Sequence, residues 1–236
     1  MDNKNLWETL EWTIHARNLI EGLQKFPKNE KIILLLRHSE IHEIKSVWKP
    51  QELLLTPIGH QVAKKFGEKL PSDRPIRIFT SHAPRCQETA SDIIEGFKRN
   101  GGNAELKGNL EPLYNLGVNH NFLLKQIEDG DLIKYVQNWI KDAFPRDKAQ
   151  LLSSYAMNSA KIIWNLILEA PINCIDIHIT HEIPIMALRF GWFNLLPDNK
   201  WVKFLGGIAF TFKNGYVQLF DIDNFLTVEV PQWWKK

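Results

Sequence analysis

Chemically versatile side chains follow three strand-like segments of the sequence, at the point where each segment ends. They are Arg37 and His38 after residues 32–36, Arg85 after residues 76–80, and His181 with Glu182 after residues 174–180. Open α/β sheets bind ligands at the carboxyl ends of their strands, so these positions predict one shared site. Guanidinium groups are forked, permanently charged donors for phosphoryl oxygens, and an unprotonated imidazole is a nucleophile. The side chains therefore predict phosphoryl chemistry at one edge of a sheet.

The segments that must position these side chains have the patterns of buried strands. Ile32 to Leu36 is an unbroken branched aliphatic run, which is typical of a strand covered on both faces. The segments 76–80 and 174–180 are rich in β-branched residues. Pro84 suits the first turn of a helix, because its missing N–H would have had no partner there. Arg85 is then expected in that first turn, beside the edge of the sheet.

Five short motifs together resemble those of the histidine phosphatase superfamily, which includes cofactor-dependent phosphoglycerate mutases. The matching pieces are residues 35–38, 55–61, 80–90, 110–114 and 179–182. Their order and spacing follow the family from about residue 31 to about residue 222. The resemblance implies an α/β fold, a three-layer α/β/α sandwich with a mostly parallel central sheet of the phosphoglycerate mutase-like kind.

The resemblance also implies roles for the four central side chains, and physical chemistry agrees with them. Arg37 and Arg85 are expected to bind the non-bridging oxygens of a phosphate monoester. His38 is expected to attack phosphorus and form a phosphohistidine, which water then hydrolyses. Two neighbouring guanidinium charges lower the pKa of His38 and so favour its reactive neutral form. His181, as the family's second histidine, is expected to donate a hydrogen bond to the transferred group.

Two carboxylates are candidates for the acid that protonates the leaving oxygen. Glu111 lies in a segment resembling the one that carries the acid in the mutase-like branch. Glu182 follows His181 where the acid phosphatase branch has aspartate. The sequence favours Glu111, because its segment matches better and Glu182 is one methylene longer than aspartate. A jointly titrating pair of carboxylates is the third alternative.

Departures from the family pattern bear on the substrate. Ser39 stands where the family has glycine, and Ile41 replaces the usual serine or threonine. The polar contacts that mutases use on phosphoglycerate are thus missing, which favours a phosphatase over a mutase-like phosphotransferase. Ser39 and His42 are predicted to contact the substrate, a phosphorylated small molecule or a phosphoprotein. A catalytically inactive phosphate-binding or scaffold protein is the alternative from another class.

Composition indicates one enzyme domain over residues 1–236. Of the 236 residues, 44% are hydrophobic, and 29 basic against 27 acidic residues give a net charge of +2, so neither nucleic acid nor a membrane is an expected partner. The histidine spacing predicts no metal site, and no cofactor is expected. Cys86 and Cys174 are too few for a disulfide framework, and the start of the chain does not read as a signal peptide. A cytoplasmic location is expected.

Helical spacing of apolar residues predicts a helical extension over residues 1–28, ahead of the first strand. We expect it to pack on the domain, with a contact in a homodimer as the alternative. Residues 112–150 are predicted to be a helical insertion that forms a partial lid, since the family places substrate-covering segments there.

Further helices are expected over residues 57–70, 84–97 and 151–168. An Asn-Gly turn at residues 214–215 predicts a hairpin that extends the sheet near the end of the chain. Trp233 and Trp234 are predicted to cover an apolar surface, with a contact between subunits as the alternative.

Overall fold

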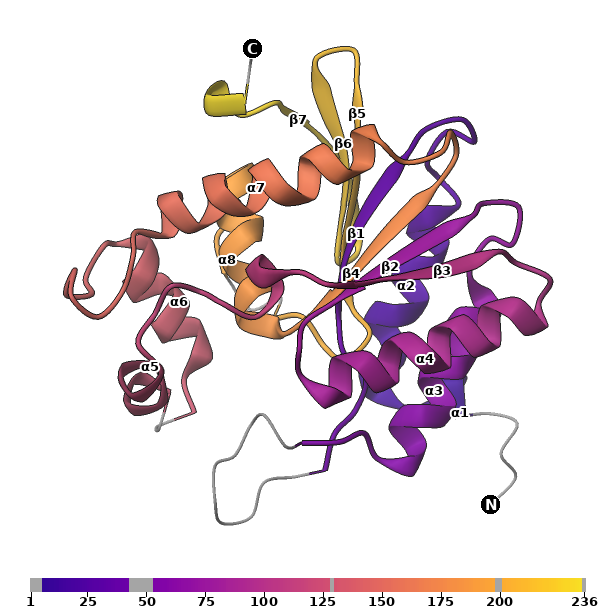
Figure 1. Cartoon of the computed structure of the whole chain (residues 1–236), viewed down its shortest axis with the longest axis horizontal. Helices are drawn as coiled ribbons and strands as arrows, with labels where there is room; N and C mark the ends of the chain where they lie inside the picture. The colour runs from indigo at the N-terminus through magenta and orange to yellow at the C-terminus, as the bar shows by residue number, and fades with distance from the viewer. Residues whose placement is uncertain (1–5, 43–52, 128–129, 198–200, 235–236) are drawn as a thin grey trace.

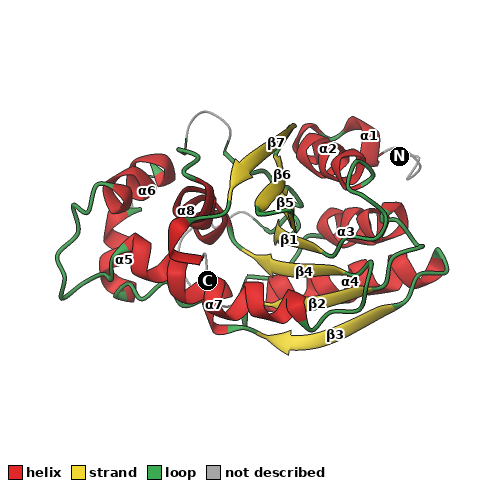
Figure 2. Cartoon of the chain, turned by 90° about the horizontal axis from the view of Figure 1, so that it is seen from above, coloured by secondary structure: helices red, strands yellow, loops and turns green. Residues whose placement is uncertain are grey.

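A seven-stranded sheet forms the centre of the computed structural model, which describes residues 6–42, 53–127, 130–197 and 201–234. The strand order is β3-β2-β4-β1-β5-β6-β7. Figure 2 shows the strands fanning across the molecule in this order. The strands are β1 Ile32–Arg37, β2 Ile76–Thr80, β3 Ala104–Asn109, β4 Ile175–Thr180, β5 Gly207–Lys213, β6 Tyr216–Asp221 and β7 Asn224–Glu229.

The parallel half of the sheet aligns the strand ends that precede the predicted site residues. In it, β1 and β2 both pair with β4, and β3 pairs with β2. The register sets Arg37 opposite Thr180, and Thr80 opposite Ile179. Because parallel strands finish at the same edge, the residues after β1, β2 and β4 come together there.

The other half of the sheet is antiparallel, so the sheet is mixed rather than mostly parallel. Strand β5 pairs antiparallel with β1, and β6 and β7 follow in antiparallel order. Asn214 and Gly215 both have positive φ, at 52° and 80°, which is the backbone that a tight two-residue hairpin requires. The predicted hairpin is therefore present, and β7, which the sequence analysis did not predict, adds a further antiparallel strand.

Helices cover both faces of the sheet, as an α/β/α sandwich requires (Figure 1). One face carries α1 Leu6–Thr9, α2 Ile14–Leu23, α3 Pro57–Lys69 and α4 Pro84–Arg99. The other carries α6 Leu132–Ile140, α7 Leu152–Leu168 and α8 Glu182–Phe193, with α5 His120–Gln126 beside them. Short 3₁₀ turns span Glu11–Thr13, Glu111–Leu113 and Gln232–Trp234. This double coverage explains why residues 32–36 are all buried.

The N-terminal extension packs on the domain, but it is broken rather than one continuous helix. Leu10 has extended backbone with ψ of 128°, and the chain restarts as a 3₁₀ turn before α2. The Thr13 hydroxyl is 2.8 Å from the carbonyl of Trp7 and 2.7 Å from that of Leu10. A threonine side chain can satisfy backbone groups that a continuous helix would pair internally, so the helical pattern is interrupted here.

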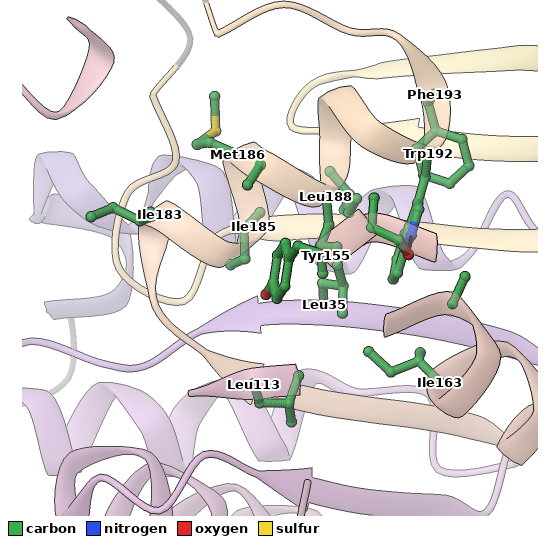
Figure 3. Close-up of a cluster of buried hydrophobic side chains, with 14 of the residues drawn as sticks. Leu35, Leu113, Tyr155, Ile163, Ile183, Ile185, Met186, Leu188, Trp192 and Phe193 are labelled. Carbon is green, nitrogen blue, oxygen red and sulfur yellow. Dashed lines mark hydrogen bonds between the residues drawn. The ribbon is translucent and has the colours of Figure 1, made fainter. Parts of the chain in front are cut away.

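The predicted insertion contributes to the core instead of standing apart from it. Tyr135, Val136 and Trp139 of α6 are buried together with Phe144, in the cluster that lies between the sheet and helices α7 and α8. Figure 3 shows part of this cluster, with Leu35 of β1 near Tyr155 of α7. The Trp139 indole N–H donates to the carbonyl of Gln150 at 2.8 Å, which closes the end of the insertion. Its role as a partial lid stays a prediction.

The chain end covers the same face of the sheet. The rings of Trp233 and Trp234 lie 5.4 Å and 5.0 Å from the buried ring of Trp164. Such aromatic contacts stabilise packing beyond the area they bury. Cys86 and Cys174 are both buried free thiols. No helix within the described residues has both the length and the apolarity needed to cross a bilayer.

Candidate active site

Two imidazoles and a guanidinium meet at the carboxyl edge of the parallel strands. His38 follows β1, His181 lies between β4 and α8, and Arg85 projects from the first turn of α4. The backbone N–H of His38 donates to the backbone carbonyl of Thr180 at 3.0 Å, which holds the chain after β1 against β4. The two imidazole rings are 5.3 Å apart, and Arg85 donates to both: Nε to Nε2 of His38 at 3.2 Å, and Nη2 to Nδ1 of His181 at 3.0 Å.

Hydrogen bonds define which nitrogen of His38 carries a lone pair. Nδ1 lies 2.7 Å from the carbonyl oxygen of Ser39, and a carbonyl can only accept, so the proton is assigned to Nδ1. Nε2 then accepts from Arg85. The ring is almost fully buried, with 2% exposed. Burial lowers the pKa of His38 well below its ordinary value, and the neighbouring His181, Arg37 and Arg85 lower it further. The neutral form of the His38 ring is therefore the favoured one.

His181 lies between Arg85 and Ser81. Its Nδ1 accepts from Arg85, while its Nε2 is 3.1 Å from the Ser81 hydroxyl. Burial lowers the pKa of His181 well below the ordinary value, with further lowering by Arg85 and Arg37. The neutral ring thus has its Nε2 proton directed at Ser81 in this arrangement. If Arg85 moves to a bound anion, the Ser81 hydroxyl can donate to Nε2 instead, which leaves Nδ1–H as a donor toward that anion.

Arg37 is held in place from three sides. Its Nη1 donates to the carbonyl of Val202 at 2.9 Å, and its Nη2 is 3.0 Å from Oε1 of Glu182. The guanidinium carbon lies 4.3 Å from the ring centroid of Phe204, a cation–π distance. Burial lowers the pKa of Arg37, and Glu182 opposes that shift. A rigidly held cation next to His38 adds to the positive potential that an anionic substrate would meet.

The two candidate acids lie in different surroundings. Glu182 is the ion-pair partner of Arg37, and 19% of its side chain is exposed. Glu111 is exposed at the start of its 3₁₀ turn, where its carboxylate accepts from Nδ2 of Asn115 at 2.8 Å. The turn is held to the carboxyl edge, because Leu110 donates to the carbonyl of Thr80 at 3.0 Å. Glu182 thus forms an ion pair with Arg37, while Glu111 lies at the same edge without an ion pair among the described residues.

Ser39 and His42, the two predicted substrate contacts, are not drawn into the cluster. The buried Ser39 hydroxyl donates to the carbonyl of Gly59 at 2.7 Å, so its proton is not available to a phosphoryl oxygen. A Cβ on Gly59 would come within 2.3 Å of the carbonyl of Glu40, so glycine is needed where α3 approaches this loop. His42 is exposed. Within the described part of the chain, neither His42 nor Glu111 makes a hydrogen bond or ion pair with Arg85 or the two imidazoles.

Three contacting residues escaped the sequence analysis. Ser81 and Thr89 lie inside a motif that it identified; Thr89 accepts from the Ser39 N–H at 3.1 Å and donates to the carbonyl of Arg85 at 2.7 Å. Their spacing of four residues on either side of Arg85 is the signal that could have identified both. Phe204 contacts Arg37 and lies 5.7 Å from the His38 ring, but no motif surrounds it. Only tertiary structure brings it to the site.

Residues 33–107 match the sequence model of the histidine phosphatase superfamily (branch 1). This segment runs from β1 to β3 and so contains Arg37, His38 and Arg85. No curated protein matches the chain.

Three solved structures have the same fold. A mycobacterial glucosyl-3-phosphoglycerate phosphatase has a TM-score of 0.57 at 14% identity, covering 84% of this chain and 97% of that one. An Entamoeba histolytica phosphoserine phosphatase variant in complex with phosphoserine has 0.55 at 19%, covering 83% and 96%. Bacillus stearothermophilus YhfR has 0.55 at 16%, covering 85% and 96%. The chain thus resembles the histidine phosphatase superfamily in sequence from β1 to β3, and it shares its fold with these solved structures.

Proposed function

We propose that this chain is a phosphatase that hydrolyses a phosphate monoester through a phosphohistidine on Nε2 of His38. Arg85 and Arg37 take the non-bridging oxygens of the phosphoryl group, because forked cationic donors match them. Nε2 forms a bond to phosphorus while the bond from phosphorus to the ester oxygen breaks. The alcohol leaves with a proton from a carboxylic acid, for which Glu111 is the preferred residue. Water then cleaves the P–N bond, and inorganic phosphate leaves.

One observation supports this proposal above the others: the hydrogen bond from Nδ1 of His38 to the carbonyl of Ser39. It fixes the proton on the nitrogen that faces the backbone and leaves the lone pair on the nitrogen that faces Arg85. Burial and neighbouring cations keep the ring neutral by lowering its pKa. A phosphate-binding scaffold has no need for a tautomer of this kind, whereas a nucleophile requires it.

The solved relatives agree with phosphate esters as substrates. Two of them are named for glucosyl-3-phosphoglycerate and phosphoserine phosphatase activities. For the present chain the substrate is proposed to be a phosphorylated small molecule or a phosphoprotein. We also propose that residues 1–236 form one histidine phosphatase-like domain, in which residues 112–150 partly cover the substrate.

The test is hydrolysis of p-nitrophenyl phosphate together with trapping of the phosphoenzyme. The wild type should release p-nitrophenol and, when quenched with labelled substrate, retain label in a bond that survives alkali and is lost in acid. His38→Ala should abolish both signals, whereas His120→Ala, an exposed histidine in α5, should retain them. Turnover that persists at the wild-type rate in His38→Ala would exclude the phosphohistidine route.

A further inference from the structure

Ser39, whose carbonyl accepts from the His38 ring, is itself anchored to two helices. Its side chain is bound to α3, because the Ser39 hydroxyl donates to the carbonyl of Gly59 at 2.7 Å. Its backbone is bound to α4, because the Ser39 N–H donates to the hydroxyl of Thr89 at 3.1 Å. Ser39 and Thr89 are both fully buried, so water does not compete for these hydrogen bonds. The residue that accepts the Nδ1 proton of His38 is therefore fixed at two points.

The Thr89 hydroxyl links the loop of the nucleophile to the helix that carries Arg85. A hydroxyl has one proton to donate and two lone pairs with which to accept. The proton of Thr89 goes to the carbonyl of Arg85, four residues earlier in α4, at 2.7 Å. The oxygen of Thr89 then accepts from the Ser39 N–H. Across this junction Nε of Arg85 lies 3.2 Å from Nε2 of His38, so one side chain helps to set the distance between the two.

The second anchor of Ser39 belongs to a tight contact at the start of α3. Thr56, the N-cap residue of α3, donates its N–H to the carbonyl of Glu40 at 3.0 Å and its hydroxyl to Oε2 of Glu40 at 2.6 Å. The backbone of Ser39 does not have positive φ, so a serine fits this position without strain. A glycine here, as the family has, could not make the bond to Gly59. The serine thus adds a connection between the loop and α3.

A fixed carbonyl beside an imidazole selects one tautomer of the ring. Nδ1 of His38 lies 2.7 Å from the Ser39 oxygen, which can only accept. While that oxygen stays in place, the proton remains on Nδ1 and the lone pair remains on Nε2. A displaced carbonyl would allow the ring to turn or to change its tautomer. The two hydroxyls therefore act on the reacting nitrogen without touching it.

We propose that Ser39 and Thr89 are positioning residues, whose hydroxyls together hold His38 in the tautomer and orientation that place the lone pair on Nε2. The consequence for catalysis rests on the proposed phosphatase function, because it concerns the same nitrogen. Neither hydroxyl is assigned to the substrate, since the proton of each is donated to a backbone carbonyl. Ser39, which the sequence analysis assigned to the substrate, acts on the nucleophile instead.

The test is NMR spectroscopy of protein labelled with ¹⁵N in its histidines, which requires no turnover. The signals of His38 are those missing from His38→Ala, and in the wild type they should report a single tautomer with the proton on Nδ1. Thr89→Val keeps the shape of the side chain but removes the acceptor of the buried Ser39 N–H. Ser39→Ala removes the bond to Gly59. Both variants should show a mixture of tautomers, and Thr89→Ser, which keeps a hydroxyl, should recover most of the wild-type spectrum.

Ser159→Ala serves as the matched control. Ser159 is buried in α7, on the other face of the sheet, and its hydroxyl donates to the carbonyl of Tyr155, also four residues earlier, at 2.7 Å. The change removes the same kind of buried hydrogen bond from a helix that does not carry Arg85. The His38 signals should stay as in the wild type. Circular dichroism checks the folding of each variant, and Ser39→Ala decides the outcome should Thr89→Val fail to fold.

Steady-state kinetics with p-nitrophenyl phosphate separates the two proposals. Where the tautomer is disturbed, kcat should fall by about tenfold to a hundredfold, since small misplacements of a reacting group have effects of this size. A single Nδ1–H tautomer in both Thr89→Val and Ser39→Ala would overturn the positioning role, whatever their turnover. Disturbed tautomers together with an unchanged kcat, or with no hydrolysis by the wild type, would retain the positioning role and contradict the phosphohistidine route.

Discussion

At the scale of single residues, one guanidinium, that of Arg85, forms hydrogen bonds with both imidazoles of the site. Arg85 donates to Nε2 of His38 and to Nδ1 of His181, so it occupies the nitrogen that is proposed to attack phosphorus. A phosphoryl group that binds there has to take over these donors. Its oxygens are better acceptors for a cation than an imidazole nitrogen, because hydrogen bonds between two charged groups are the stronger ones. In the proposed reaction, substrate binding would thus free Nε2 of His38 at the same time as Arg85 turns to the phosphoryl group.

Ser81 is predicted to position His181 in this exchange. Ser81→Ala removes the hydroxyl that would donate to Nε2 and leave Nδ1–H directed at phosphate. We expect kcat to fall by about tenfold to a hundredfold, because one preorganised donor to the transferred group is lost, while KM changes little.

The ¹⁵N chemical shifts of His181 provide a readout that a general loss of stability would not change. In the phosphate-bound wild type they should report a proton on Nδ1, and in Ser81→Ala a mixture of tautomers. Ser81→Thr, which keeps a hydroxyl, should recover part of the activity. Identical His181 shifts in wild type and Ser81→Ala would show that Ser81 does not set the tautomer.

Replacing Glu111 and replacing Glu182 are predicted to have different effects on the turnover of alkyl and aryl esters. A proton donor matters for alkyl esters, whose alkoxide is a poor leaving group, and matters little for p-nitrophenolate. Glu111→Gln should therefore lower kcat for ethyl phosphate by about a hundredfold or more and affect p-nitrophenyl phosphate far less. Glu182→Gln removes the ion pair with Arg37 and should impair the turnover of both substrates to a similar extent. The reverse pattern in steady-state kinetics would assign the acid to Glu182.

At the scale of elements, close packing of α3 on α4 holds Arg85 in place. A Cβ on Gly96 of α4 would lie 1.9 Å from the carbonyl of Lys64 in α3, and a Cβ on Gly67 would lie 2.2 Å from the carbonyl of Ile93. Backbone atoms cannot give way as a flexible side chain can. The two helices therefore approach each other through glycines, and the start of α4 takes its position from this contact.

Gly96→Ala should push α4 away from α3. We expect the free energy of unfolding to fall by about 2 kcal/mol or more, since overpacking of a tight contact has costs of this size. Activity should fall as well, because α4 carries Arg85. Glu95→Ala, a neighbouring change at a partly exposed residue that removes only surface ion pairs, should alter both little. Urea denaturation and kcat/KM measure the two effects, and a Gly96→Ala protein of wild-type stability would refute the packing argument.

The elements also show which parts of the fold the sequence could predict. β1, β2 and β4 were predicted because their aliphatic residues are buried on both faces. β3 was missed because it is a polar edge strand, and its register with β2 shifts between Leu106 and Gly108. The break before α2 was missed because helical spacing of apolar residues continues across Thr13, whereas its hydroxyl bonds are a tertiary outcome. The position of Phe204 beside Arg37 was missed for the same reason, because it results from tertiary packing and no local sequence pattern indicates it.

At the scale of the whole molecule, the buried core contains a histidine that the proposed mechanism does not use. His178 of β4 is fully buried and stacks on Phe79 with ring centroids 4.9 Å apart. Neither of its ring nitrogens has a hydrogen-bond partner among the described residues. Burial lowers the pKa of His178 to about 3, with a smaller contribution from Arg77. Together with His38 and His181, it makes the fold depend on histidines that stay neutral.

This histidine should make the molecule sensitive to acid, and the sign follows from proton linkage. The folded pKa is lower than the unfolded one, so below about pH 6.5 the unfolded chain binds the proton first and the free energy of unfolding decreases. One such histidine contributes a slope of up to about 1.4 kcal/mol per pH unit. His178→Leu should remove that slope, so its stability relative to wild type rises as pH falls from 6 toward 4. Urea denaturation across this range checks the expectation, with exposed His120→Ala as the control, and parallel stability curves for wild type and His178→Leu would contradict it.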